Sequence, residues 1–282
     1  MKKINKFKSA IIIAILFAFG LNFVGCEKEK DISGNTLSKS IVQNPYDFVG
    51  TYHNLLMNIV CDKFLNESAV SMDELSNYII AESSTYICNL IPLYSYSEWS
   101  DRFYKELPIL INIVDSSAHS HFLYNLKDPI YASLNLSNFQ IQTIQELLDF
   151  IEDTDNLNDI PIYINHIERK IIQSSIPMEE SWILLGVLSV AKHSFNFGIN
   201  YFYVKKGISV SGLKKILKNI VRDDALGFVA GLIGSVISGH ASVALVFGPE
   251  GAVCVMMGDA IIGAVSGSAI SALVNLGIAV HR

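Results

Sequence analysis

Apolar residues recur three or four positions apart along most of the chain after residue 44, and the strict alternation typical of β-strands is scarce. The first such face consists of Phe48, Tyr52, Leu55, Ile59 and Phe64. A later one, with acidic residues opposite, consists of Ile141, Ile144, Leu148 and Ile151. Residues at this spacing share one face of an α-helix, so the pattern predicts an all-α domain over residues 44–205.

Helix start signals precede these segments. Asn44 is predicted as an N-cap, with Pro45 at the first helical position. The stretches SMDE (71–74) and SNFQ (137–140) fit a capping box, SYSE (95–98) starts a short helix, and Pro177 opens a longer apolar helix. Ser211 is predicted to cap a basic amphipathic helix. Short strands over residues 161–164 or 201–204 remain open alternatives.

Two apolar runs, residues 225–247 and 252–280, follow that basic start, and the second contains a single charge, Asp259. Small residues recur at every fourth position of these runs, as in glycine-zipper segments, which they resemble. The first ladder is Gly227, Gly231, Ser235 and Gly239; the second run has Ala260, Ala264, Ser268 and Ala272 beside Gly263, Gly267 and Ser271. Gly-Pro-Glu-Gly (248–251) is typical of a turn. We therefore expect residues 211–282 to form an antiparallel helical hairpin in which the backbones of the two helices approach each other closely.

Three interpretations of this hairpin remain open. Each run exceeds the ~20 residues needed to span a bilayer. Apolarity on all sides also fits the buried centre of a helical bundle. In the third interpretation the hairpin moves between these states, as in the pore-forming colicins, which the arrangement resembles. Asp259, His240 and Asn275 would be less costly at a helix interface than facing lipid.

The N-terminus has the pattern of a secretory signal peptide. Four lysines in residues 1–8 precede an apolar run that ends at Cys26. The residues FVGC resemble the lipobox of bacterial lipoproteins, which implies cleavage before Cys26 and lipidation of its thiol. Residues 1–25 are therefore predicted as the signal peptide. Residues 26–43, charged and rich in Ser, Asn and Gly, are predicted as a flexible tether.

Charge excludes one class of partner. The chain has 21 basic and 27 acidic residues. Residues 1–25 contain four lysines and no acid, so their removal leaves 17 basic and 27 acidic residues, a net charge of −10. A nucleic-acid-binding protein needs a basic surface, and this balance argues against one.

Residues that could carry chemistry are few. Cys61 and Cys88 lie on successive predicted helices and form either a disulfide or two buried thiols. His119 and His121 are the best metal candidates, but no third ligand is identified. His53 lies beside the first apolar stripe and is interpreted as a packing or capping histidine. Common catalytic motifs are missing from the sequence, so no cofactor is expected and an enzyme is the least favoured function.

The stretches NPYDFVGTYHN (44–54) and LSVAKHS (188–194), followed by the glycine-rich tail, resemble a group of uncharacterised Bacteroidetes lipoproteins. The resemblance implies a helical domain joined to a glycine-rich segment and supplies no activity. The sequence thus predicts an exported outer-membrane lipoprotein, periplasmic or surface-exposed, acting as a non-enzymatic, membrane-associated or self-associating interaction module. A pore-forming, bacteriocin-like effector is the first alternative and an unidentified enzyme the second.

Overall fold

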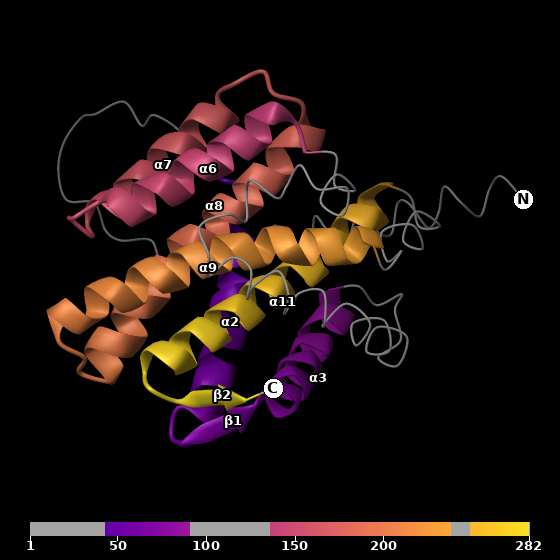
Figure 1. The fold of residues 1–282 in the computed structure, drawn as a ribbon. Coiled ribbons are helices and arrows are strands. Elements are labelled where there is room, and N and C mark those ends of the chain that lie inside the picture. Colours follow the sequence, from indigo (N-terminus) through magenta and orange to yellow (C-terminus); the bar gives the residue numbers. More distant parts are fainter. Residues whose placement is uncertain (1–42, 91–135, 238–248, 282) are drawn as a thin grey trace, which may run out of the picture. The chain divides into compact units, whose positions relative to one another are not determined.

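Helices make up most of the computed structural model, which describes residues 43–90, 136–237 and 249–281 (Figure 1). In chain order, the described helices are α2 (Asp47–Phe64), α3 (Met72–Leu90), α6 (Asn138–Asp153), α7 (Asp159–Ile172), α8 (Met178–Gly198), the π-helix η2 (Ile199–Lys205), α9 (Val210–Ile237) and α11 (Pro249–Asn275). The predicted all-α class is confirmed. The signal peptide, the tether with Cys26, the SYSE segment, His119, His121, Gly239 and His240 lie outside the described residues.

Several predicted helix starts are confirmed. Ser137 caps α6 with a full capping box, in which its hydroxyl accepts from the Gln140 N–H and the Gln140 side chain accepts from the Ser137 N–H. Ser71 Oγ accepts a 3.1 Å hydrogen bond from the Glu74 N–H at the start of α3. Helix α8 begins immediately after Pro177. The starts of α6 and α3 depend on local side chain–backbone hydrogen bonds, and that of α8 follows a proline, whose fixed φ favours the start of a helix. Both signals act within a few residues, which is why the sequence alone reveals them.

Two predicted starts are wrong. Helix α2 begins at Asp47, and the Asn44 side chain accepts from the Tyr46 N–H in a turn that precedes the helix. Helix α9 begins at Val210, and Ser209, two residues before the predicted cap Ser211, accepts from the Gly212 N–H. Asn44 is drawn away from capping because its amide also bonds to α7 and α8, described below.

The buried face of α2 is also displaced from the predicted one. Phe48 and Leu55 are 39% and 40% exposed. The buried residues are Val49, Gly50, His53, Leu56, Met57, Val60, Cys61 and Phe64. Helix α2 contacts α3, α8 and α11, and these neighbours cover the face one residue further along. Tertiary contacts therefore override the position of the largest side chains.

The strand alternatives are wrong as well. Residues 161–164 belong to α7 and residues 201–204 to η2. Within the described ranges, the strands are β1 (Ala69–Ser71) and β2 (Ala279–His281), which pair in parallel with Val70 opposite Val280. The last apolar run thus leaves the helix at Asn275, turns at Gly277, whose φ is 79°, and ends as a strand.

Helices α9 and α11 lie side by side at the centre of one hydrophobic core that also includes residues of α2, α3, α6, α7 and α8 (Figure 1). Contact positions run in opposite directions, since Asp223 lies against Gly267 and Gly231 lies against Asp259. The two helices are therefore antiparallel. Pro249, Glu250 and Gly251 form the first turn of α11 and not the predicted reverse turn, because proline fits the first helical position. The connection over residues 238–248 lies outside the described residues.

Glycines let these two helices touch backbone to backbone. A Cβ atom placed on Gly227 would lie 2.4 Å from the Gly263 carbonyl oxygen and 3.0 Å from Ala264 Cα. A Cβ atom on Gly231 would lie 2.2 Å from the Asp259 carbonyl oxygen and 2.6 Å from Ala260 Cα. These distances are far below van der Waals contact. The small-residue positions therefore determine how closely α9 and α11 pack, and we call this contact the glycine seam.

Candidate functional site

A fully buried polar cluster joins α2, α9 and α11. His53 Nε2 lies 3.3 Å from Asp224 Oδ2 and 3.4 Å from Ser268 Oγ. All three residues are completely buried. Ser268 is a predicted ladder residue whose hydroxyl contacts His53 of α2, so it does more than leave room for a neighbouring backbone. Asp224, which precedes the first apolar run, was not singled out by the sequence.

Hydrogen bonds fix the orientation of the His53 ring. Asn54 donates from its amide nitrogen to the His193 carbonyl oxygen at 2.8 Å, which turns Asn54 Oδ1 toward His53 Nδ1 at 3.2 Å. Because Oδ1 can only accept, Nδ1 carries the proton and Nε2 faces Asp224 and Ser268. The pair is consequently either an imidazolium with a carboxylate or a neutral imidazole with a carboxylic acid.

Burial favours the uncharged form of the carboxyl group. Burial raises the pKa of Asp224, and the charge and hydrogen bond of His53 oppose this rise. Burial also raises the pKa of the adjacent Asp223, against the opposing effect of Arg222, whose Nε lies 2.9 Å from Asp223 Oδ1. Asp223 and Asp224 are thus two neighbouring acids of α9, and burial stabilises the protonated form of each.

The cluster has the residue types of a serine hydrolase triad but not its geometry. In such a triad the serine and the acid bind opposite nitrogens of the imidazole ring. Here Ser268 and Asp224 both approach Nε2, and Nδ1 is occupied by Asn54. No atom of the three side chains reaches solvent, so a substrate could not contact Ser268 without separating the helices. The arrangement fits a structural polar contact between helices.

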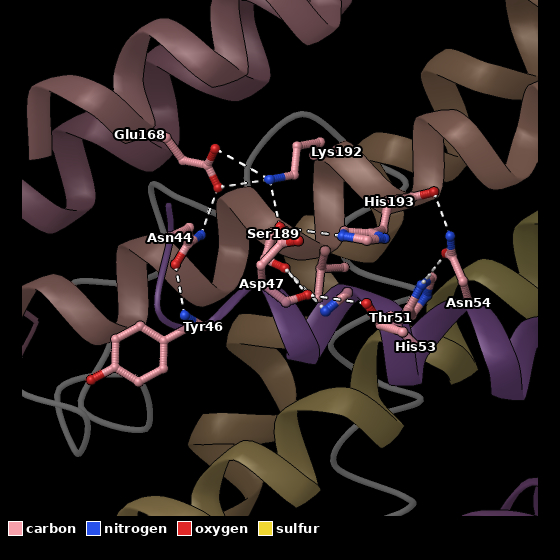
Figure 2. A network of polar contacts seen from close by, with 12 residues as sticks. Asn44, Tyr46, Asp47, Thr51, His53, Asn54, Glu168, Ser189, Lys192 and His193 are labelled. Atoms are coloured by element: carbon pink, nitrogen blue, oxygen red, sulfur yellow. Dashed lines mark hydrogen bonds and ion pairs between the residues drawn. The ribbon is translucent and has the colours of Figure 1, made fainter. Parts of the chain in front are cut away.

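A second polar network lies at the start of α2, where that helix packs against α8 and Glu168 of α7 joins the network (Figure 2). Lys192 Nζ lies 2.5 Å from Asp47 Oδ1 and 3.2 Å from Glu168 Oε1. The Asn44 amide donates to Glu168 at 2.6 Å and to the Leu185 carbonyl oxygen at 2.9 Å. Glu168 is buried, and these two partners compensate for the removal of its carboxylate from water.

The charges of this network stabilise one another. Burial alone would raise the pKa of Asp47, but hydrogen bonds from His193 and Lys192 and their charges lower it to about 2. Burial alone would lower the pKa of Lys192, but Asp47 and Glu168 raise it. The network therefore holds the start of α2, the point at which the predicted tether would join, against α7 and α8.

The cysteine and seam residues singled out from the sequence are buried where the structure describes their side chains, and they contribute to packing. Cys61 is a free, buried thiol, so the structure does not contain the proposed disulfide with Cys88, which lies in α3. Seam residues Gly227, Gly231, Ser235, Ala260, Gly263, Ala264 and Gly267 are all buried. No group of three or more metal-ligating side chains occurs among the residues that the structure describes.

Two helices of the described ranges are long and apolar enough to cross a bilayer, Glu180–Lys205 and Val255–Asn275. The apolar windows of these helices are 78% and 89% buried by the rest of the protein. The central helices of water-soluble proteins share this length and composition, so these properties do not by themselves make either helix a membrane span.

Comparisons with family models, with curated proteins and with solved structures give no match for this chain. The functional argument therefore depends on the residues and contacts described above.

Proposed function

We propose that this chain is an exported, lipid-anchored protein whose helical unit acts as a non-enzymatic module at a membrane surface. The observation that carries the proposal is the glycine seam. Its small residues are used within the chain, so α9 and α11 serve as the centre of a folded unit. Membrane attachment is then supplied by the lipobox-like FVGC and Cys26. More than one acyl chain, as on bacterial lipoproteins, anchors a protein stably.

The chemistry of the site supports the non-enzymatic part of the proposal. The His53, Asp224 and Ser268 cluster is sealed and has both partners on the same ring nitrogen. A groove between α6 and α7 is lined by residues that include Thr143, Tyr163 and His166, and it contains no member of this cluster. A buried, geometrically unsuited cluster is better explained by helix packing than by catalysis.

The anchor is tested by labelling growing cells with a palmitate analogue. The chain should be labelled, and Cys26→Ala should remove the label and leave the uncleaved precursor in the inner membrane. Cys254→Ala is the matched control and should keep the label, because only the lipobox cysteine is modified. Label persisting in the Cys26→Ala variant would contradict the anchor.

A second candidate function is pore formation. It is favoured by α11, an apolar helix covered by other helices and held beside buried acids. Under this candidate, α9 and α11 leave the unit and enter a bilayer. The full chain should then release a dye from phospholipid vesicles, and more so at acidic pH, where protonated Asp223 and Asp224 enter lipid at lower cost. If the chain releases no dye at neutral or at acidic pH, pore formation is rejected and the anchored, non-enzymatic module is retained.

A further inference from the structure

An exposed apolar tip lies where η2 joins α9, at the left-hand end of α9 in Figure 1. Tyr203, Val204 and Val210 are 47%, 70% and 64% exposed. They are three of the eight large hydrophobic residues that are exposed in the described part of the chain, and they fall within one eight-residue stretch. Scattered exposed apolar residues are normal, whereas a cluster of them marks an interaction site. We call residues 203–210 the apolar tip.

Buried residues and hydrogen bonds anchor the apolar tip to the helical unit. Tyr201 and Phe202, which directly precede it, are buried, and the Tyr201 hydroxyl donates to Asp62 Oδ1 at 2.6 Å. Ile208 N–H donates back to the Phe202 carbonyl oxygen at 3.0 Å. Because the π-helical turn buries Tyr201 and Phe202, the next two side chains point outward. π-helical turns are frequent at functional sites.

The outer part of the tip borders open space. Gly207 has a φ of 68°, in the left-handed region that glycine adopts without strain. A Cβ atom placed on it would have no neighbour within 4 Å. The tip therefore forms a protruding turn and not the wall of a groove. A protruding turn suits insertion into a soft surface better than enclosure of a peptide or a small molecule.

The charge around the tip differs from that of the rest of the chain. Between Glu180 and Asp223 the sequence contains no acid and seven basic residues: Lys192, Lys205, Lys206, Lys214, Lys215, Lys218 and Arg222. Three of these pair with acids of other segments: Lys192 with Asp47, Lys214 with Asp155 and Arg222 with Glu152. Lys206, within the tip, and Lys215, on the first turns of α9, are exposed. Lys205 pairs with Asp62 at 2.7 Å. A chain with net charge −6 thus has two exposed lysines, Lys206 and Lys215, beside its exposed apolar turn.

We propose that the apolar tip docks onto the headgroup region of an anionic phospholipid bilayer. Tyr203, Val204 and Val210 would enter the interface, and Lys206 and Lys215 would lie among the anionic headgroups. Apolar side chains beside lysines are the combination with which proteins bind such surfaces. The inference deepens the proposed function by naming the lipid chemistry that the helical unit contacts. It depends on the exposed residues themselves and not on acylation of Cys26.

The proposal is tested with the full chain, reconstituted into vesicles that contain lipids brominated on their acyl chains. Tyr203→Trp places a fluorophore on the tip, and bromine quenches only tryptophans that enter the bilayer. Ile162→Trp is the matched control, because Ile162 is 64% exposed on a different helix, α7. Fluorescence of the wild-type chain gives the background of Trp99 and Trp182. We expect quenching of the Tyr203→Trp variant and almost none of the Ile162→Trp variant.

The charge requirement is tested in the same assay. Quenching of the Tyr203→Trp variant should be stronger in phosphatidylglycerol-containing vesicles than in phosphatidylcholine vesicles. Adding Lys206→Gln should lower the ratio of docked to undocked tips about fivefold, as expected for the loss of one lysine near an anionic surface. Lys170→Gln, at an exposed lysine of α7, should leave it unchanged.

Equal quenching of the Tyr203→Trp and Ile162→Trp variants would overturn docking of the tip. An absence of quenching in both variants would also overturn it, because the tip would then face solution or a protein partner. Equal quenching in both kinds of vesicle would overturn the anionic preference. Mass spectrometry of Cys26 on the same samples reports acylation separately. A chain without acyl groups whose tip is still quenched would contradict the anchor and support the tip, and an acylated chain without quenching would do the reverse.

Discussion

Gly231→Ala is the substitution that tests the glycine seam most directly. A methyl group at this position would lie 2.2 Å from the Asp259 carbonyl oxygen, 2.8 Å from Asp259 C and 2.6 Å from Ala260 Cα. All three atoms belong to the backbone of α11, so no side-chain rotation can relieve the overlap. Helix α11 would have to move away from α9, along a contact that lies at the centre of the core.

The size of the effect follows from opposing contributions. Alanine favours a helix over glycine by about 1 kcal/mol, which acts in favour of the variant. Restoring ordinary contact requires a separation of about 1 Å, and a gap of that size removes about half of the dispersion attraction of the affected atoms. Overpacking of a core costs about 1–3 kcal/mol, and more where the backbone must shift. We therefore expect a net loss of about 2 kcal/mol.

The assay is urea unfolding followed by circular dichroism, together with thermal unfolding. For a domain of this size, 2 kcal/mol corresponds to a fall in Tm of about 4–8 °C. Gly212→Ala is the matched control, since Gly212 lies in the same helix and a Cβ atom there would be 3.3 Å from the Ile208 Cγ2 methyl group, a side-chain and not a backbone atom. That variant should be neutral or more stable. If Gly231→Ala unfolds at the same urea concentration as Gly212→Ala, the glycine spacing does not control the packing.

Three further predictions concern the polar groups. Because burial raises the pKa of Asp224 in the folded state above its ordinary value, its contribution to stability is present at acidic pH and is lost as the pH rises through the folded-state pKa. As the pH falls toward 3.8, the ordinary pKa of this carboxyl group, the wild-type chain should therefore gain stability in urea unfolding relative to Asp224→Asn, and a constant difference would contradict the raised pKa. Lys192→Met should destabilise the protein by about 2 kcal/mol, because it removes the cation beside the buried Glu168. It should also raise the pKa of Asp47 from about 2 toward 3.8, measured by NMR titration; an unchanged value would rule out the Lys192 contribution. Cys61, whose pKa is raised by burial, should react with a maleimide only after unfolding, and rapid labelling of the folded chain at this residue would refute its burial.

Local signals in the sequence determined the helices and several of their starts. The capping box at Ser137 and the proline before α8 act through hydrogen bonds and backbone angles within a few residues. The four-residue ladders could be recognised for the same reason, because residues four apart lie on one face of a helix. The seam between Gly231 and Ala260 is the packing that such ladders predict.

The tertiary structure decided which faces are covered and which polar groups meet. The face of α2 that carries Phe48 and Leu55 has ample hydrophobicity, yet its neighbours cover the face that carries His53. His53, Asp224 and Ser268 are far apart in the sequence and have no shared spacing. Only the packing of three helices brings them within hydrogen-bond distance.

The strand assignments also depended on tertiary structure and not on local sequence. Val70 and Val280 pair across 210 residues of sequence. Residues 201–204, whose β-branched and aromatic side chains suit a strand, instead complete a π-helix, because Tyr201 and Phe202 fill the core beneath it. Local propensity is a small free-energy difference per residue, and burial of an aromatic side chain outweighs it. The sequence by itself therefore determined the class of the fold and the close approach of α9 and α11. The sealed polar cluster and the exposed apolar tip were decided by tertiary packing, since each depends on which residues neighbouring helices cover.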